Sequence, residues 1–593
     1  MRLLRIVVIG VVLACAVPSG AQTAAFTIEA VTSAPFPTTL TASATGERIA
    51  WTLNAQGRRN VWVAEGPAFV ARQLTAYETD DGQELNALQI SADGAWVVYQ
   101  RGGDFGSNWD DAAPVNPTGA TTPAAVGIWA VPFGGGAPIA LGEGVNPVLS
   151  PRSDVVVFER ARQLWSVPIG GGTPATKLFD QRGAAGDARF SPDGSRLAFV
   201  SSRGDHAFIA VYTNASTPVR YLAPTTSRDG SPRWSPDGSS IAFVRRPGAG
   251  GPPPSSLEPA PTPWSIWIAD VSAGHAQQRW ASGTEPRDTV PFTHGGTNLH
   301  WTGTGRLVFL SYQDGWPHLY SMTASGTDAP LLLTPGDHMA EHVTIAPDGR
   351  HALYAGNLGT TAGDIDRRHV VRVPVDRAAP EVLTPGNGLE WSPVVLATGR
   401  VAAIGGDSQQ APVPFAFDTV DPAVRPNGAG RIVIGASAVP ATFPARQLVV
   451  PTPVTFTASD GGRVHGQLFT PAGAGTAKRP AIVYIHGGPM RQMLLGWHYG
   501  DYYWNAYALN QYLASRGFIV LSVNYRLGIG YGFDFHRRLI GFDLGDDLAR
   551  FDLIADLHQP FREIALLHRR REGGHQNCGH LLLRRAIRRP GRA

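Results

Sequence analysis

The residues best placed to do chemistry lie in one short stretch, RPAIVYIHGGP, at residues 479–489. Its uninterrupted apolar run, 481–485, predicts a buried strand, and His486, Gly487 and Gly488 follow directly. Backbone N–H groups after a strand can be aimed at the negative charge that develops on an oxygen during acyl transfer. We therefore interpret His486, Gly487 and Gly488 as an oxyanion hole. The alternative is that the two glycines only turn the chain.

An oxyanion hole serves a nucleophile, and the sequence offers none in the expected form. A hydrolase with an α/β sheet needs Gly-x-Ser-x-Gly, because the strained turn from strand to helix lifts the serine oxygen into the site. The nearest match in these 593 residues, GASAV at 435–439, lacks the second glycine and precedes the glycine turn. We predict that no catalytic Ser-Asp-His triad is present in this sequence.

The elements around the glycine turn can be predicted from their patterns. The segment PTPVTFTASDGGRVHGQLFTP, 451–471, is typical of two strands joined at Asp460-Gly461-Gly462. Residues 502–517 carry apolar side chains at helical spacing and end on Gly517, a suitable helix C-cap. The stretch 518–532 reads as a second buried strand that leaves into a glycine loop. Strand, helix and strand with continuous apolar strands indicate a parallel sheet.

The acidic segment GFDLGDDLARFDLIADL follows at 541–557. Its apolar residues recur at helical spacing, which indicates an amphipathic helix with the carboxylates on its solvated face. No base, metal triad or phosphate-binding loop accompanies these acids, so a solvated face is the preferred interpretation.

Most of the chain before this region is an internal repeat. Clear copies begin at Ile90 (ISADGAWVVYQ), Phe190 (FSPDGSRLAFV), Trp234 (WSPDGSSIAFV) and Ile345 (IAPDGRHALYA). Weaker copies begin at Ser43, Leu149, Trp301 and Leu396. Pro-Asp-Gly supplies a tight turn, and the alternating residues after it predict a strand. One unit cannot bury its apolar face, so neighbours must stack; seven or eight copies predict a β-propeller with seven or eight blades.

Composition and charge narrow the class of protein. Charged residues make up 16% of the chain, hydrophobic residues 43%, and there are 69 glycines and 48 prolines, which is typical of a loop-rich globular protein. The net charge of +3 favours no polyanionic partner, so we expect no nucleic acid. The segment 247–263 is too rich in proline and glycine to pack and is expected to be a loop.

The N-terminus predicts export. Arg2 and Arg5 precede a short apolar run, and Ser19-Gly20-Ala21 is a small-residue cleavage site, so residues 1–21 are interpreted as a signal peptide. A lipoprotein signal ending at Cys15 is the alternative, and it would give a lipid anchor. Cleavage after Ala21 would leave Cys578 as the one cysteine, so we expect no disulfide framework. We expect a periplasmic or secreted protein.

Two sets of motifs together resemble one family. The SPDG…AF units resemble the propeller repeats of TolB and of the prolyl oligopeptidase family of serine peptidases. YIHGGP followed by a helix and VNYRLGIGYG resembles the start of the α/β-hydrolase domain of that family, with dipeptidyl peptidase IV-like and acylaminoacyl peptidase-like members nearest. The resemblance covers about residues 22–531. It implies cleavage of short peptides by a triad between the two domains, without a cofactor, with the propeller restricting access.

The resemblance assigns some residues and leaves others unmatched. His486, Gly487 and Gly488 match the family's oxyanion-hole turn, where some members have tyrosine in place of His486. Dipeptidyl members hold the substrate amino terminus with two adjacent glutamates on a propeller helix. No Glu-Glu pair occurs here, which favours an acylaminoacyl or oligopeptidase type, although Glu84 or Glu285 could substitute.

The tail departs from the family. The serine should lie roughly eighty residues after HGGP, near 564–571, where this chain reads IALLHRRR. The arginine-rich segment 561–593 has no strand-turn-helix pattern, and we interpret it as an aberrant tail from a truncated or frameshifted reading frame. Two alternatives are a metal site at His575, Cys578 and His580, for which the partner ligands are lacking, and an arginine cluster that binds an acidic surface.

These inferences give one predicted organisation. A signal peptide (1–21) precedes a β-propeller (22–445), the N-terminal part of an α/β-hydrolase peptidase domain (446–560) and the tail (561–593). We expect a serine-type peptidase for short peptides by resemblance, inactive as this chain because the triad is lacking. The alternative is a TolB-like propeller that binds proteins and carries a vestigial hydrolase segment.

Overall fold

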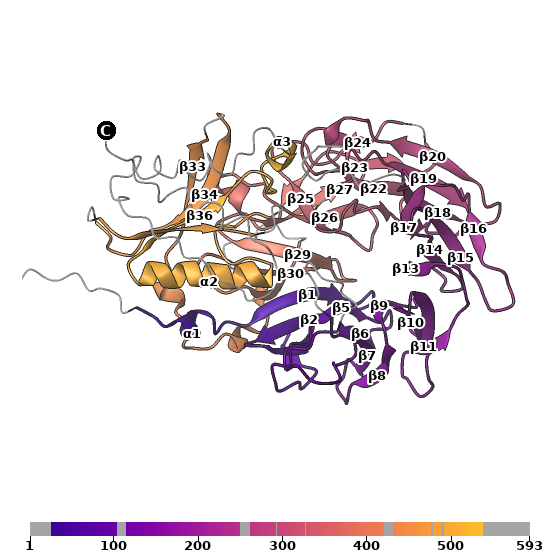
Figure 1. The fold of residues 1–593 in the computed structure, drawn as a ribbon, viewed down its shortest axis with the longest axis horizontal. Coiled ribbons are helices and arrows are strands. Elements are labelled where there is room, and N and C mark those ends of the chain that lie inside the picture. Colours follow the sequence, from indigo (N-terminus) through magenta and orange to yellow (C-terminus); the bar gives the residue numbers. More distant parts are fainter. Residues whose placement is uncertain are drawn as a thin grey trace, which may run out of the picture.

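The computed structural model describes residues 25–103, 114–249, 261–291, 293–326, 328–419, 431–458, 461–475, 478–487 and 491–537. The expected signal peptide, the acidic segment, the tail and Gly488 lie outside these residues, as does most of the Pro/Gly-rich loop, 250–260. Within the described ranges the fold is dominated by β-strands, most of them antiparallel (Figure 1). No helix among them is long and apolar enough to cross a membrane.

Among the described residues, 36–433 form eight successive antiparallel groups of four strands, where the repeat predicted seven or eight units. The first four groups are β1 Phe36–Ala42, β2 Arg48–Ala55, β3 Arg58–Glu65, β4 Arg72–Gln73; β5 Leu85–Ile90, β6 Trp96–Arg101, β7 Gly127–Pro132, β8 Ile139–Glu143; β9 Val145–Leu149, β10 Val155–Arg160, β11 Gln163–Pro168, β12 Thr176–Lys177; and β13 Ala184–Phe190, β14 Leu197–Ser202, β15 Ala207–Tyr212, β16 Arg220–Leu222. The other four are β17 Arg228–Trp234, β18 Ser240–Arg246, β19 Ser265–Asp270, β20 Ala276–Ala281; β21 His300–Trp301, β22 Arg306–Ser311, β23 His318–Thr323, β24 Leu331–Leu332; β25 Ala340–Ile345, β26 His351–Gly356, β27 His369–Pro374, β28 Glu381–Val382; and β29 Leu389–Val395, β30 Val401–Gly406, β31 Val413–Phe417, β32 Ile432–Val433. A single parallel pairing, Ala207 with Arg228, joins the fourth and fifth groups into one sheet.

The turn between the first two strands of a group is built by the SPDG motif. Asp193 Oδ1 accepts hydrogen bonds from the Ser191 hydroxyl at 2.6 Å and from the Ser195 N–H at 3.1 Å, while Gly194 has φ +69°. The Ser191 hydroxyl also accepts the Arg196 N–H at 2.9 Å. The same arrangement recurs at Ser91–Asp93–Trp96 and Ser235–Asp237–Ser240. The predicted roles of Asp and Gly in this turn are confirmed.

A second feature marks each group independently of that motif. One non-glycine residue at or just before the first strand has a positive φ, between 43° and 54°, and we call these the bulge residues: Thr39, Ala87, Asn146, Asp187, Ser231, Asn298, His342 and Ser392. The pairing of the first strand with the second shifts register beside most of them. The groups with weak sequence copies therefore share the backbone of the clear ones.

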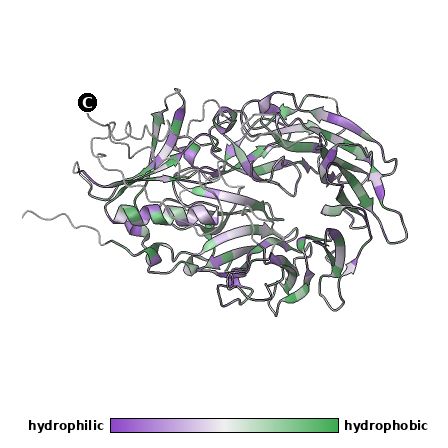
Figure 2. Cartoon of the chain, viewed as in Figure 1, coloured by the Kyte–Doolittle hydropathy of each residue, from purple (hydrophilic) through white to green (hydrophobic). Residues whose placement is uncertain are grey.

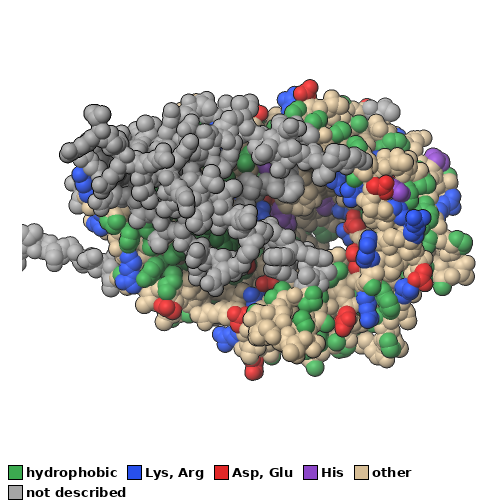
Figure 3. Space-filling view, in the orientation of Figure 1, with side chains coloured by type: hydrophobic (Ala, Val, Ile, Leu, Met, Phe, Trp, Pro, Cys, Tyr) green, Lys and Arg blue, Asp and Glu red, His purple; other side chains and the backbone are tan. Residues whose placement is uncertain are grey.

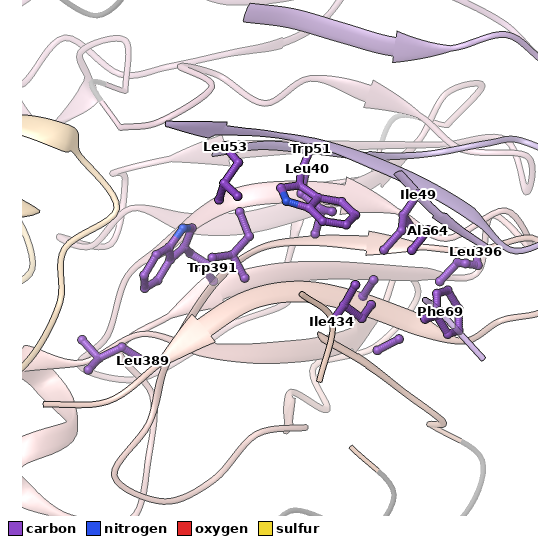
Figure 4. Close-up of a cluster of buried hydrophobic side chains, with 14 of the residues drawn as sticks. Leu40, Ile49, Trp51, Leu53, Ala64, Phe69, Leu389, Trp391, Leu396 and Ile434 are labelled. Atoms are coloured by element: carbon purple, nitrogen blue, oxygen red, sulfur yellow. The ribbon is translucent and has the colours of Figure 1, made fainter. Parts of the chain in front are cut away.

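The first and last groups pack against each other. Leu40, Trp51 and Leu53 of β1 and β2 share one buried cluster with Leu389 and Trp391 of β29 (Figure 4). Across the same seam Arg400 pairs with Glu47 at 3.1 Å. In Figure 1 the groups follow one another around the molecule until β29 and β30 lie beside β1 and β2, a propeller-like arrangement. Figure 2 shows apolar residues concentrated within these strands.

The C-terminal region forms a separate four-stranded sheet in the order β33-β34-β36-β35. Its strands are β33 Thr452–Thr457, β34 Arg463–Phe469, β35 Ala481–Ile485 and β36 Ile519–Asn524, and β35 runs parallel to β36. Helix α2, Asp501–Ser515, connects these two strands and ends before Gly517, whose φ is +91°. The predicted hairpin, strand, helix and strand are therefore confirmed.

The remaining helices among the described residues are short. They are α1 Ile28–Val31, α3 Phe533–Arg537 and the 3₁₀ turns η1 Pro286–Asp288, η2 Ala362–Asp366, η4 Ala436–Ala438 and η5 Ala445–Gln447. Helix α1 packs against α2, and Val31 shares a buried cluster with Trp497, Trp504 and Tyr507. The N-terminal segment thus belongs structurally to the C-terminal sheet as well as to the repeats.

Candidate functional site

The turn that contains His486 and Gly487 lies where β35 ends. Strands β35 and β36 are parallel, so their carboxyl ends share one edge of the sheet. Small-molecule and catalytic sites of α/β sheets gather at this edge. Gly487 is exposed, and a Cβ added to it would meet no described atom within 4 Å. Among the described residues, the backbone at Gly487 is thus open to an approaching group.

The imidazole of His486 is withdrawn from solvent. The residue is 2% exposed, and its ring stacks on Tyr525 with 4.4 Å between ring centroids. Burial lowers the pKa of His486 to about 4, and the charge of Arg491 adds to this effect. The ring is therefore neutral at pH 7. Its Nε2 is buried without a partner among the described residues, so an oxyanion would reach this nitrogen only by entering the protein.

Two tyrosine hydroxyl groups hold the carbonyls of this turn. Tyr525 on the loop after β36 donates to the His486 carbonyl oxygen at 3.0 Å, and Tyr503 on α2 donates to the Gly487 carbonyl oxygen. Burial raises the pKa of Tyr525 to about 12 and that of Tyr503 above its usual value, so both remain donors at neutral pH. Fixing the carbonyls fixes the peptide planes and hence the direction of the N–H groups. These tyrosines were not predicted; TyrTyrTrp at 502–504 and the Tyr after VN were the only sequence signals.

A row of rings extends from this turn into the repeat region. Tyr503 contacts His498 at 5.1 Å between centroids, and His498 contacts Tyr499 at 4.4 Å. Tyr499 in turn packs edge-on against the bulge residue His342 at 5.2 Å and lies 6.1 Å from Trp391. The glycine turn and the first strands of the last two groups are therefore in mechanical contact through aromatic side chains.

His498 is fixed in one protonation state within this row. Its Nδ1 accepts the Gly500 N–H at 2.8 Å, so the proton must reside on Nε2, which donates to the Gln492 carbonyl oxygen at 3.0 Å. Burial lowers the pKa of His498 to about 3. The ring is therefore neutral at pH 7, and it supports the packing of Tyr503 and Tyr499 on either side of it.

A buried polar network joins the same two regions. Arg368, between η2 and β27, is fully buried and donates to Glu341 of β25 at 2.5 Å and to Gln492 Oε1 at 2.9 Å. The amide of Gln492 donates to Asp366 Oδ1 at 3.1 Å, and Tyr531 donates to the same oxygen. Burial raises the pKa of Asp366 to about 6, against these hydrogen bonds. This network orients the segment that leads from the glycine turn into α2.

Other residues considered from the sequence lie elsewhere. Ser437 is exposed in η4, ahead of the C-terminal sheet, which agrees with excluding it as a nucleophile. Glu84 pairs with Arg59 at 3.2 Å within the first two groups, and Glu285 caps η1 on the surface. Glu341 is the buried glutamate that reaches the aromatic row, accepting the Tyr499 hydroxyl at 3.3 Å. In the described part of the chain no three His, Cys, Asp or Glu side chains are arranged to hold a metal ion.

The known proteins to which this chain is similar are peptidases. No protein-family profile matches the chain. A segment of 63 residues, 11% of this chain, is 43% identical to dipeptidyl aminopeptidase BIII from Pseudoxanthomonas mexicana but spans 8% of the length of that relative. Among solved structures, dipeptidyl peptidase 4 from Porphyromonas gingivalis matches 89% of this chain and 78% of its own, with 13% identity and a TM-score of 0.62. A puromycin-hydrolyzing peptidase from Mycobacterium tuberculosis matches 82% and 74%, with 17% identity and a TM-score of 0.56.

At these identities the structural matches establish a shared fold, and the short curated match agrees with them in kind. The described chain thus has the fold of prolyl oligopeptidase-family peptidases, and the resemblance predicted from its repeats and its HGGP motif is confirmed.

Proposed function

We propose that this chain is part of a prolyl oligopeptidase-type serine peptidase for short peptides. Its residues supply the turn that stabilises the oxyanion and the repeat region that restricts access of peptides to the site. The observation that carries this proposal is the placement of His486 and Gly487 at the carboxyl edge of parallel strands, with both carbonyls held by tyrosines. The peptidases that share the fold support it.

In the proposed mechanism the turn acts through its backbone. A substrate carbonyl whose oxygen gains negative charge would accept N–H groups from the turn at Gly487 and Gly488, which we assign as the donors. One such donor, aimed in advance, contributes roughly 3 kcal/mol to the transition state. His486 stays neutral at pH 7, so it adds no positive charge, and its ring on Tyr525 supports the turn from behind.

We further propose that the eight groups of strands are the eight blades of a closed propeller. The eight bulge residues and the packing of β29 against β1 support eight rather than seven. The predicted boundaries, 22–445 for the propeller and 446–560 for the partial hydrolase domain, and export to the periplasm or beyond belong to this proposal. The signal-like first 21 residues support export.

The chemical step needs a nucleophile that these 593 residues do not encode in the form Gly-x-Ser-x-Gly. We therefore propose that a polypeptide of this sequence binds peptides without forming an acyl-enzyme. The alternative function, a TolB-like binding propeller with a vestigial hydrolase segment, predicts no affinity for peptides at the turn.

A fluorophosphonate probe tests the first proposal. The purified chain should show no labelling, while a relative that carries Gly-x-Ser-x-Gly, treated identically, is labelled. Labelling of this chain would mean that one of its serines is activated and would refute the inactive assignment. Peptide aldehydes, which present a carbonyl oxygen to an oxyanion hole, should bind more weakly to a Tyr503→Phe variant; equal binding would favour the TolB-like alternative.

A further inference from the structure

A cleft separates the repeat region from the C-terminal sheet two strands away from the glycine turn. It has a volume of about 500 Å³ and is lined by Asp337, His338 and Thr361 on the repeat side and by Thr455, Arg463 and His465 on the sheet side. A smaller hollow of about 320 Å³ adjoins it and shares Asp337, Arg463 and His465. Volumes of this order are typical of small-molecule sites.

Two opposite charges in this cleft are uncommitted. Asp337, between β24 and β25, and Arg463, at the start of β34, are both exposed and line both hollows. Neither forms an ion pair with a described residue. The other carboxylates of the larger wall are engaged, because Asp364 pairs with Arg367 at 3.0 Å and Asp366 accepts from Gln492 and Tyr531. Among the described residues, the larger cleft therefore presents one free anion and one free cation from opposite walls, while the smaller hollow is also lined by Asp534.

The imidazole of His338, next to Asp337 in the chain, is buried and lines the same cleft. His338 is 1% exposed, and neither of its ring nitrogens has a partner among the described residues. Burial, together with the neighbouring His318, lowers the pKa of His338 to about 4, so at pH 7 the ring offers one donor and one acceptor. A buried polar group without a partner costs about 1–3 kcal/mol, and a ligand that satisfies it recovers this energy.

We propose that this cleft binds a short unblocked peptide as a zwitterion. Its ammonium group pairs with Asp337, its carboxylate with Arg463, and its amide engages the ring of His338. The site lies at the same edge of the sheet as the glycine turn, since His465 of β34 is paired with Asn524 at the end of β36. This inference rests on the proposed binding of short peptides, to which it adds a place and a way of recognising both charged ends of the peptide.

The test is calorimetric titration of the full chain with alanylalanine, N-acetyl-alanylalanine and alanylalaninamide. Alanylalanine should bind, and each blocked form should bind at least tenfold more weakly, because each removes one of the two charges. Asp337→Asn should abolish the discrimination against the acetylated peptide, and Arg463→Gln the discrimination against the amide. The matched control is the double variant Asp376→Asn and Arg377→Gln. These two side chains form an exposed ion pair, with Asp376 60% and Arg377 65% exposed.

Three outcomes would overturn the proposal: no binding of alanylalanine at millimolar concentration, equal affinity for the blocked forms, or wild-type selectivity in both cleft variants. Both substituted side chains are exposed, so the variants should fold, and an unchanged circular dichroism melting curve verifies this. Activated-serine labelling is unaffected by these variants, so its result reports on the proposed function alone.

Discussion

The repeat region and the C-terminal region are stabilised in different ways. In the repeats, the defining contacts are local: Ser191, Asp193 and Arg196 hold one turn within six residues, and the same turn recurs at Ser91 and Ser235. In the C-terminal region the defining contacts span more than a hundred residues, as between Arg368 and Gln492 or between Asp366 and Tyr531. Contacts between residues close in the chain produce short motifs that can be recognised in the sequence, whereas contacts between distant residues produce no such motif.

This difference also separates scaffold from site. The repeats use the same turn several times, so a single turn contributes little to the whole. The glycine turn depends on one network and one aromatic row, each present once. Substitutions in the second class should therefore have larger and more directional effects than equally conservative substitutions in the first.

The largest effect is expected from Arg368→Met. The substitution leaves Glu341 buried and unpaired, which destabilises by about 3–5 kcal/mol. Urea denaturation should show this loss, and limited proteolysis should release the C-terminal region first. Arg245→Met, which breaks the buried pair with Asp229 inside one group, is the matched control and should not expose the C-terminal region. If both variants give the same cleavage pattern, the proposed coupling by Arg368 is wrong.

Tyr531→Phe should have a smaller effect. It removes the hydroxyl that donates to Asp366 and that accepts from Asn524 at 2.8 Å, at a cost of about 1–3 kcal/mol. Thermal unfolding measures this cost. Tyr212→Phe, at a partly buried tyrosine in the repeats, should change stability by less than about 0.5 kcal/mol. An equal loss in both variants would argue against a special role for the network.

The free energy of unfolding should depend on pH through the protonation of His498. Its folded pKa, about 3, lies below the ordinary value of 6.5, so the stabilising contribution is present above pH 6.5 and is lost as the pH falls. The expected loss between pH 7.5 and 5.5 is about 1.4 kcal/mol. His498→Gln should flatten the stability curve over this window relative to the parent chain. Asp366 acts in the opposite sense, since its raised pKa makes its contribution fade as the pH rises through 6.

The smallest effect is expected within the repeats. Ser191→Ala leaves the Arg196 N–H without its hydroxyl acceptor and should cost about 1 kcal/mol. Hydrogen exchange should show faster opening of β13 and β14 alone. The equivalent substitution Ser235→Ala should behave alike in β17 and β18; a loss that spreads to the C-terminal sheet would contradict the local character of the repeats.

Much of the fold could be predicted from the sequence because its determinants are short. SPDG turns and alternating strands identified the repeats, and the apolar run 481–485, the helix ending at Gly517 and the strand after it were found in order. The weak copy near Trp301 shows the limit, since its first strand has only two residues, His300 and Trp301. The sequence motif at Trp301 gives no indication that only two residues of this first strand pair with the second strand.

The site was predictable only in its backbone. His486 and Gly487 were identified by their place after a strand, but nothing in the local sequence indicated that Tyr503 and Tyr525 would fix their carbonyls. Gln492 and Arg368 are separated by 124 positions, and their contact results from packing one region on the other. The oxyanion role of Gly488 falls outside the described residues and stays a prediction.

The space-filling surface gives a related contrast. Beside the hollow seen in Figure 3, basic and acidic side chains of the repeat region lie interspersed at the surface. The aromatic row, in contrast, is shielded, with His498 1% exposed. Salt should therefore influence the approach of charged peptides to the repeats far more than the stability of the row.

The bulge residues have a consequence for how such chains change over time. A left-handed torsion angle is set by steric contact within a single residue, and glycine or asparagine adopts it with least strain. Thr39, a β-branched residue in this conformation, lies in the group that meets the last one. Asn146 and Asn298 already have such a residue, and substitution by Gly or Asn is the change that these backbone angles favour at the other six positions. The positive φ therefore still identifies each unit where the surrounding sequence has diverged.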